Sequence, residues 1–576
     1  MAKEAGDAAV IVRLCGRLPL AVRIAGARLA ARPQWSLDHL VRVLTDERQR
    51  LNGLVTGDLG VRASIASSYR ALGGEVARLF RLLGTLDVPD FAGWVAAAVL
   101  DSSLDDGVAA LEALVDAHLL AVTPATAPGQ YRYRFHDLVR LYARERAEAE
   151  ELPEERITSV SRALGAWLGM AEVMSDQTPG PCYAPIRGAA ARLRVDPADV
   201  SDVDPVAWFD AECAALMRAV SQACALGLDE LAYELAGCLE RYFDLRGMYA
   251  EWSETNSRVL RLCEDTGNLR GQATMLRGLI EVRTWNNPEQ DADAMAALLA
   301  DATRLRDTFA AVGEERGVAD ALVLCSWAHT AKGGYDQARA AGTESLRLAT
   351  STGHLGGQAR ALVALALAAA ETGQIAEAVG KLDQALVASR ELGNPRHEAT
   401  VLQFLGIAHC QIGNTDVSQR LLDAALAISR GCGDRYAEVL TMLALARLDL
   451  RRGDPSARAA AEAALAWGRH YNMRHHVADA LSILGEISVA EGRPASAVPY
   501  LVESVAMWRK RGWLSFLASA LVSLGLAFAS SDQQAARAAL TEAREIYTQL
   551  GDHPTALAVT RHVTGLRRAR RTGTDG

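Results

Sequence analysis

The stretch Gly353–Gly393, "GHLGGQARALVALALAAAETGQIAEAVGKLDQALVASRELG", holds two helix-length segments, each followed by a glycine that can end it. The same arrangement recurs along the chain. Its helix-ending residues are spaced by 39 or 40 positions: Gly313, Gly353, Gly393, Gly433, Asn472, Gly512 and Gly551. Gly and Asn most readily adopt the left-handed conformation that ends a helix. The spacing therefore predicts a series of helical hairpins of about 40 residues each.

A second series of turns lies half a repeat away, and small residues recur with the same period. The second turns read "GGYDQA", "GQIAEA", "GNTDVS", "GDPSAR", "GRPASA" and "DQQAAR". The small residues form two columns: Ser326, Ala366, Gly406, Ala446, Gly485 and Gly525; and Ser345, Ala385, Ala425, Ala464, Ser504 and Ala543. Small side chains let the two helices of a hairpin approach closely. Because one hairpin cannot bury its own apolar face, the hairpins are expected to stack into a solenoid.

The solenoid is expected to cover residues 231–565, with fainter units at 246–267 and 286–313. Residues 512–531 include no charge and are long enough to cross a bilayer. They lie where every repeat places its first helix, so we predict a buried helix there. The remaining residues, 566–576, are expected to form a disordered basic tail.

The first 150 residues have a different organisation. Residues 1–57 are predicted to be helical, and residues 58–150 continue with helical segments that include 91–100. Two β-prone runs follow, "LLAVT" and "YRYRF", and then an amphipathic helix. Helices followed by a β-hairpin predict a winged helix over 58–150, and residues 151–230 are predicted to be a helical linker. The expected fold class is therefore mostly all-α.

Composition narrows the class of protein. Half of the 576 residues are apolar, only 6% are aromatic, and the net charge is −9. An acidic balance does not favour nucleic-acid binding. The nine cysteines contain no C-x-x-C pair, which indicates a reduced, cytoplasmic protein.

Five motifs carry a resemblance to a known family. They are "GRLPLAVRIAGARLAARPQW", "DLGVRASIASSYRAL", "ARLFRLLG", "LVDAHLL" and "YRFHDLVRLYARERA". In order and spacing they resemble the C-terminal part of the NB-ARC module of large actinobacterial regulators of the Streptomyces antibiotic regulatory protein type. Those regulators belong to the STAND group of switch ATPases and carry tetratricopeptide repeats. The stretch 206–220 is similar to the linker helix that precedes their repeats.

The resemblance implies a nucleotide role for two residues. Pro19 of "GRLPLA" would lie against adenine, and His136 of "FHD" would reach the phosphates of ADP. The ordinary alternatives are that Pro19 begins a helix and that His136 caps one. The sequence contains no G-x-x-x-x-G-K-[ST] phosphate loop. We therefore expect no cofactor for this chain alone, and ADP or ATP only if a separate or missing part completes the site.

Other candidate sites are weaker. His470, His475 and His476 lack the spacing of a zinc site, so a solvated turn is expected and no metal site. The helix before the β-hairpin carries only acidic charges, which opposes DNA binding. These are Asp105, Asp106, Glu112 and Asp116. The four arginines at 567, 568, 570 and 571 are assigned to a solvated tail. No catalytic motif is present, so no catalytic residue is assigned and an enzyme is not expected.

Two functions follow. The favoured one is the non-catalytic sensing portion of a STAND-type bacterial transcriptional regulator of secondary metabolism. Its right-handed solenoid would bind a protein, a peptide or a small effector on the concave face, without direct contact with nucleic acid or membrane. The DNA-binding half would be lost through a truncated or misassigned start, or supplied by another polypeptide. The alternative is a free-standing repeat adaptor that holds proteins together.

Overall fold

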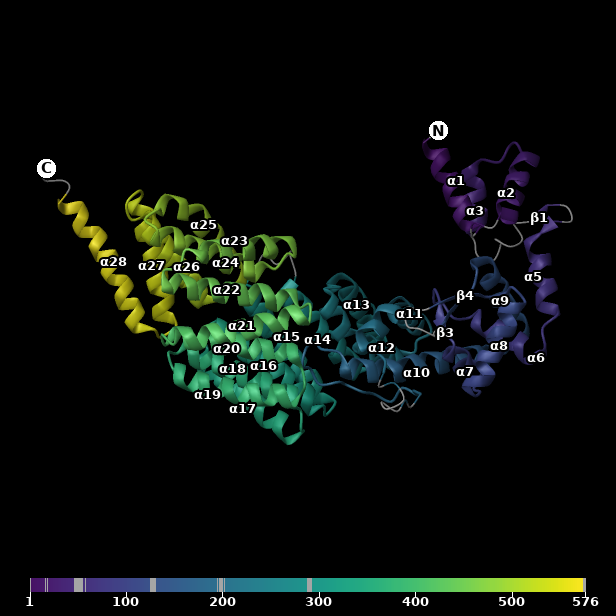
Figure 1. Cartoon of the computed structure of the whole chain (residues 1–576), viewed down its shortest axis with the longest axis horizontal. Coiled ribbons are helices and arrows are strands. Elements are labelled where there is room, and N and C mark those ends of the chain that lie inside the picture. Colours follow the sequence, from purple (N-terminus) through teal and green to yellow (C-terminus); the bar gives the residue numbers. More distant parts are fainter. Residues whose placement is uncertain are drawn as a thin grey trace. The chain divides into compact units, whose positions relative to one another are not determined.

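The computed structural model describes residues 2–572 except 16, 18, 46–54, 57–58, 125–130, 194, 196–199, 201 and 287–292. The chain forms two compact units. The first comprises Met1–Thr178 and Gly188–Leu239, and the second comprises Pro179–Arg187 and Glu240–Gly576. The chain therefore leaves the first unit after Thr178, contributes a short segment to the second, and returns (Figure 1).

The first unit is mainly helical. Its elements are α1 (Ala2–Leu14), α2 (Pro19–Ala31), α3 (Leu37–Thr45), β1 (Val55–Thr56), β2 (Leu59–Gly60), α5 (Val61–Arg70), α6 (Gly74–Leu83), β3 (Phe91–Ala92), α7 (Trp94–Leu100), α8 (Leu104–Asp116), β4 (Ala121–Pro124), β5 (Tyr131–Arg134), α9 (Asp137–Glu150), α10 (Pro153–Gln177), α11 (Pro205–Ala225) and the first part of α12 (Asp229–Arg246).

The predicted β-hairpin is present and belongs to a three-stranded antiparallel sheet with the order β3-β5-β4. The helix predicted over 91–100 is wrong at its start, because Phe91 and Ala92 form strand β3. Phe91 is buried and stacks on Tyr133, its partner in the register. An apolar run does not distinguish a short buried strand from a helix. Helix α7 begins only at Trp94.

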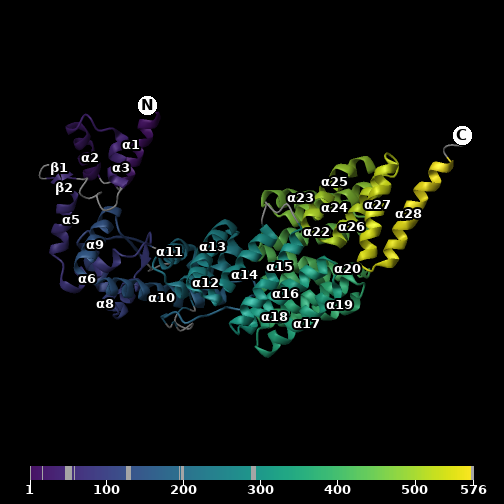
Figure 2. The same ribbon diagram turned by 180° about the vertical axis from the view of Figure 1, so that it is seen from behind.

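The second unit is an array of antiparallel helices (Figure 1; Figure 2). It continues from α12 through α13 (Tyr249–Thr266), α14 (Leu269–Asn286), α15 (Ala294–Ala311), α16 (Glu315–Ala331), α17 (Tyr335–Ser351), α18 (Leu355–Glu371), α19 (Ile375–Glu391), α20 (Pro395–Gln411), α21 (Thr415–Gly431), α22 (Arg435–Arg452), α23 (Ser456–His470), α24 (Arg474–Ala490), α25 (Pro494–Arg511), α26 (Leu514–Phe528), α27 (Gln533–Gln549) and α28 (His553–Thr572). The predicted all-α class with a repeat solenoid is confirmed. Helix α28 continues to Thr572, into the stretch for which a disordered tail was predicted.

Both series of turns have the expected backbone. The residues that end the second helices, from Gly313 to Gly551, have φ between 54° and 75°. The glycines of the intervening turns, from Gly333 to Gly492, have φ between 70° and 84°. Every one of them lies in the left-handed region, in which residues other than Gly and Asn are strained. The period found in the sequence therefore corresponds to a left-handed backbone conformation that recurs at each turn.

The small-residue columns mark the closest helix contacts. A Cβ at Gly406 would lie 2.7 Å from Leu422, and one at Gly525 would lie 2.6 Å from Leu540. Where the column has serine, the hydroxyl donates to a backbone carbonyl of the neighbouring helix, as Ser326 does to Ala338 at 2.8 Å. The small residues thus set the distance between the two helices of each hairpin.

We predict that Gly485→Ala destabilises the protein by about 1–3 kcal/mol, the usual cost of overpacking. The added Cβ would lie 2.4 Å from Leu501 Cγ on the facing helix, which cannot move without repacking the hairpin. The measurement is the free energy of unfolding in urea. Gly380→Ala is the matched control: it lies within α19, its Cβ would meet nothing within 4 Å, and helix propensity gives a gain of up to about 1 kcal/mol. Equal effects of the two changes would contradict the packing role.

Within the second unit the array curves until its last hairpins contact its first ones. Ser515 on α26 donates to Glu371 on α18 at 3.0 Å, and Arg511 on α25 donates to the carbonyl oxygen of Thr284 on α14. One apolar cluster contains both Phe309 and Trp508. Stacking of neighbouring repeats predicts none of these contacts, because they depend on the curvature of the whole array.

The uncharged stretch 512–531 forms α26 in this array. Its side chains Leu517 and Leu521 are buried against the neighbouring helices. Among the described residues, no helix combines the length and the apolar character needed to cross a membrane.

Candidate functional site

The first helices of successive hairpins surround a cavity of about 730 Å³ inside the second unit. It is lined mainly by α14, α16, α18, α20, α22, α24 and α26. Aromatic side chains provide apolar surface, among them Trp327, Phe404, Trp513 and Phe516. A concave cavity with aromatic surface and convergent polar groups is the usual form of a ligand site.

The segment Pro179–Arg187 forms part of the wall of this cavity. Its residues Gly180–Tyr183 line the cavity directly. Two guanidinium groups pack against the ring of Tyr183, that of Arg277 at 4.7 Å and that of Arg360 at 4.2 Å from its centre. Its hydroxyl donates to Glu281. Burial and the charge of Glu281 raise the pKa of Tyr183 well above its ordinary value, so the hydroxyl keeps its proton at neutral pH.

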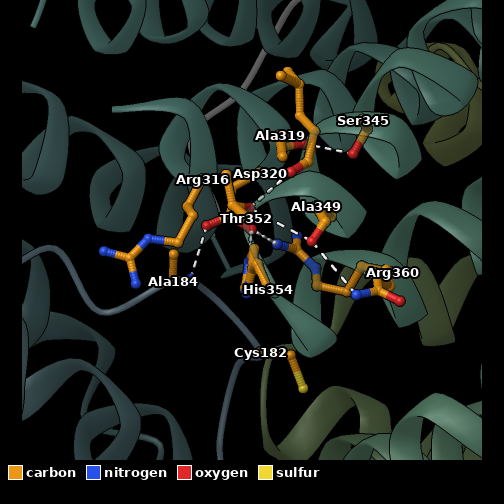
Figure 3. A network of polar contacts seen from close by, with 12 residues as sticks. Cys182, Ala184, Arg316, Ala319, Asp320, Ser345, Ala349, Thr352, His354 and Arg360 are labelled. Atoms are coloured by element: carbon orange, nitrogen blue, oxygen red, sulfur yellow. Dashed lines mark hydrogen bonds and ion pairs between the residues drawn. The ribbon is translucent and has the colours of Figure 1, made fainter. Parts of the chain in front are cut away.

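Asp320 on α16 is the centre of the polar contacts beside this segment (Figure 3). It is fully buried and accepts hydrogen bonds from four donors. These are the Ala184 N–H at 2.9 Å, His354 Nε2 at 3.1 Å, Arg277 at 3.2 Å and Arg360 at 3.3 Å. Burial alone would raise the pKa of Asp320, but the histidine and the two arginines hold it at about 2.

The register of the repeat explains how these residues meet. Asp320 and Arg360 occupy the same position in consecutive first helices, and so does Thr400 one repeat further on. His354 and Asn394 both precede a first helix by one residue. Residues one period apart lie along one line inside the solenoid. Comparing polar residues at the 40-residue period is therefore the signal that could have identified this site from the sequence.

A second ion-pair cluster lies further along the cavity. Arg396 on α20 bonds to Asp244 and Asp434, each at 2.6 Å. Although burial opposes the charge, these two carboxylates raise the pKa of Arg396 above its ordinary value. A buried arginine with two carboxylate partners is a permanently charged, rigid part of the wall.

At two carboxyl groups on the cavity wall, polar partners do not fully offset the effect of burial on the pKa. Burial raises the pKa of Glu371 on α18, although Ser515 donates to it. Burial likewise raises the pKa of Glu486 on α24, although Arg447 lies 3.4 Å away. Their hydrogen-bonding capacity, together with the aromatic surface, suits a ligand with polar groups on an extended frame.

Cys182 faces the same cavity but is not poised for chemistry. It is buried, and burial raises the pKa of its thiol to about 11. A protonated thiol is a poor nucleophile. Cys182 therefore contributes contacts to the site.

The two residues predicted to bind a nucleotide lie in the first unit. Pro19 is the exposed first residue of α2, while Gly16 and Leu18 of the same motif are outside the described residues. His136 precedes α9, and its Nδ1 accepts from the Leu138 N–H at 3.3 Å. The structure thus places both residues at helix starts, and their nucleotide role remains a prediction.

The prediction of a solvated turn for the three histidines is wrong for two of them. His470 is exposed, but His476 is fully buried and donates from Nε2 to the carbonyl of Tyr436 at 3.2 Å. His475 packs among Trp508, Trp513 and Phe516. Both lie on α24, whose cavity-facing side the sequence alone did not identify. In the described part of the chain, no cluster of three potential metal ligands occurs.

The acidic side chains of α8 occupy its exposed face. All four, Asp105, Asp106, Glu112 and Asp116, are exposed. Residues 178–193, which follow α10, form no helix, although a helical linker was predicted over 151–230. The proline-rich run "PGPCYAPIR" at 179–187 is the sequence signal for this extended segment.

Comparisons with known proteins agree with this architecture. The family model described as tetratricopeptide repeat matches residues 357–431. The solved STAND protein with a tetratricopeptide repeat sensor from Pyrococcus horikoshii superposes with a TM-score of 0.52 at 14% identity, over 92% of this chain and 73% of that one. The second unit is thus a tetratricopeptide-repeat solenoid.

Two curated relatives share the description "Regulatory protein AfsR". The protein from Streptomyces griseus is 33% identical over 359 residues, which is 61% of this chain and 35% of that protein. The protein from Streptomyces coelicolor is 47% identical over 185 residues, which is 31% of this chain and 18% of that protein. The chain is therefore similar in sequence to two AfsR regulatory proteins, and it spans about a third or less of the length of these relatives.

Proposed function

We propose that the chain is the non-catalytic sensing portion of a STAND-type bacterial transcriptional regulator and acts in the cytoplasm. In this role the solenoid binds a protein or peptide effector in its cavity. The observation that carries the proposal is the cavity of about 730 Å³ lined mainly by the first helices. The similarity to two regulatory proteins supports the regulatory role.

The proposal assigns signal reception to the second unit and response to the first. Effector binding changes a regulator only through its differential affinity for two states of the protein. A nucleotide enters the proposal only if a phosphate loop is supplied by another part, with Pro19 and His136 as the residues that would contact it. No step of catalysis is assigned to this chain.

We predict that a cavity-filling substitution weakens effector binding. Ala370 on α18 lines the cavity, and Ala370→Trp would place an indole inside it. The measurement has two stages: quantitative capture from an actinobacterial extract on the immobilised full chain, and then titration with the purified captured species. We expect the affinity of Ala370→Trp to be at least about 10-fold lower than that of the unchanged chain, equivalent to about 1.4 kcal/mol.

Ala466→Trp is the matched control, because Ala466 is exposed on α23 outside the cavity. It should bind as the unchanged chain does. Binding that survives Ala370→Trp but is lost in Ala466→Trp would place the partner on the outer surface and support an adaptor instead. Circular dichroism of both variants verifies that each is folded.

A further inference from the structure

We propose that the cavity recognises an extended peptide with a tyrosine side chain, and that residues 179–187 of the chain itself occupy this peptide site. The inference rests on the proposed function and names the class of effector and the way its site is regulated. We call residues 179–187 the internal peptide.

Side chains of the solenoid bind the backbone of the internal peptide. Asn394 donates to the carbonyl of Gly180 at 2.9 Å, and Arg277 donates to the carbonyl of Ala184 at 2.9 Å. The N–H of Ala184 donates to Asp320. Backbone groups are common to all peptides, so these three contacts are available to any extended chain in this position.

The side-chain pocket adds selectivity. Tyr183 is only 5% exposed, its ring packs against two arginines, and its hydroxyl donates to Glu281. The guanidinium groups favour an aromatic ring, and the carboxylate favours a ring with a hydroxyl. The pocket therefore fits tyrosine better than phenylalanine or an aliphatic side chain.

The solenoid is shaped to admit a backbone at this point. A Cβ at Gly356 would lie 2.4 Å from the carbonyl oxygen of Cys182. The equivalent positions in the neighbouring repeats hold Arg316 and Arg396. The glycine at this repeat position thus leaves room for the backbone of the internal peptide.

The internal peptide covers only one part of the cavity. It contributes Gly180–Tyr183 to the lining, while other elements contribute the rest, among them Trp513 and Phe516. Tethering gives the internal peptide an effective concentration of roughly millimolar order. An external peptide therefore replaces it only by adding contacts elsewhere in the cavity. Because the first unit resumes at both ends of the internal peptide, its release links occupancy of the cavity to that unit.

The first test uses a fluorescein-labelled peptide with the sequence of residues 179–187, titrated with full-length chains and followed by anisotropy. Tyr183→Ala empties the aromatic pocket, so this variant should bind the probe at least about 10-fold more tightly than the unchanged chain. A probe with alanine in place of tyrosine should bind neither. Tyr471→Ala is the control, since Tyr471 is 45% exposed and outside the cavity, and it should match the unchanged chain.

The second test needs no variant. Hydrogen–deuterium exchange of the unchanged chain is measured with an excess of the same peptide, isotope-labelled so that its mass is distinct. Displacement should speed exchange at the amides of residues 179–187, and the alanine peptide should have no effect. Absence of probe binding to a folded Tyr183→Ala chain, with exchange at 179–187 unchanged, would refute the internal-peptide proposal. The proposed function would survive that result if Ala370→Trp still weakened effector binding as expected.

Discussion

Asp320→Ala is expected to lower the free energy of unfolding by about 3–5 kcal/mol. The carboxylate of Asp320 is fully buried and accepts from His354, Arg277 and Arg360, as well as from the internal peptide. Truncation would leave buried guanidinium charges without this partner. The loss from breaking a buried ion pair exceeds the net contribution of the pair itself, because the remaining charge stays desolvated.

The measurement is urea denaturation at pH 7, followed by circular dichroism and tryptophan fluorescence. Asp336→Ala is the matched control: Asp336 pairs with Arg339 at 2.8 Å, but its side chain is 90% exposed. Exposed pairs contribute about 0–1 kcal/mol, so the control should change stability little. Asp320→Asn should fall between the two, since it keeps an acceptor and loses the charge. A loss of less than about 1 kcal/mol in Asp320→Ala would show that the network does not hold the repeats together.

Lowering the pH from 7 to 5 is expected to destabilise the solenoid through its buried histidines. Burial, with the charge of Arg360, lowers the pKa of His397 to about 4. Burial, with the charge of Arg511, lowers the pKa of His476 to about 3. Both stay neutral in the folded protein, whereas the unfolded chain takes up protons below about pH 6.5. The contribution of these histidines to the free energy of unfolding is therefore fully present above that pH. It is lost as the pH falls toward their pKa values in the folded protein.

The expected loss at pH 5 is about 2 kcal/mol for each histidine, since each pH unit below 6.5 contributes about 1.4 kcal/mol. Burial also lowers the pKa of His475 and of His329, which adds to the loss. Burial raises the pKa of Glu371 and Glu486, which opposes the trend, and Asp320 contributes only below about pH 4 because its pKa is about 2. The contribution of one histidine is therefore measured as the difference in pH dependence between a histidine variant and the unchanged chain.

His397→Asn should reduce the change in unfolding free energy between pH 7 and pH 5 by about 2 kcal/mol. Asparagine retains a polar partner for Ser389, which lies 2.7 Å from His397 Nδ1. His470→Asn is the control, because His470 is exposed and should leave the pH dependence unchanged. An identical pH dependence in His397→Asn and the unchanged chain would contradict the assignment.

The repeat architecture could be predicted from the sequence because it rests on local physics. A positive φ at Gly353 or Gly393 requires glycine or asparagine, and the close approach at Gly485 requires a residue without a side chain. Each requirement restricts the residue type at one position, and the restriction recurs with the period of the repeat. The same reasoning placed α26 in the core of the solenoid.

The candidate site could not be predicted in the same way. Tyr183 meets Glu281, and Gly180 meets Asn394, across large separations in the chain. Ser515 lies beside Glu371 because the array curves back on itself. That curvature is the sum of small rotations between successive repeats, and no single residue or motif encodes it. The amino-acid sequence therefore specified the hairpins and their period, while packing over the whole array created the cavity and set the internal peptide within its wall.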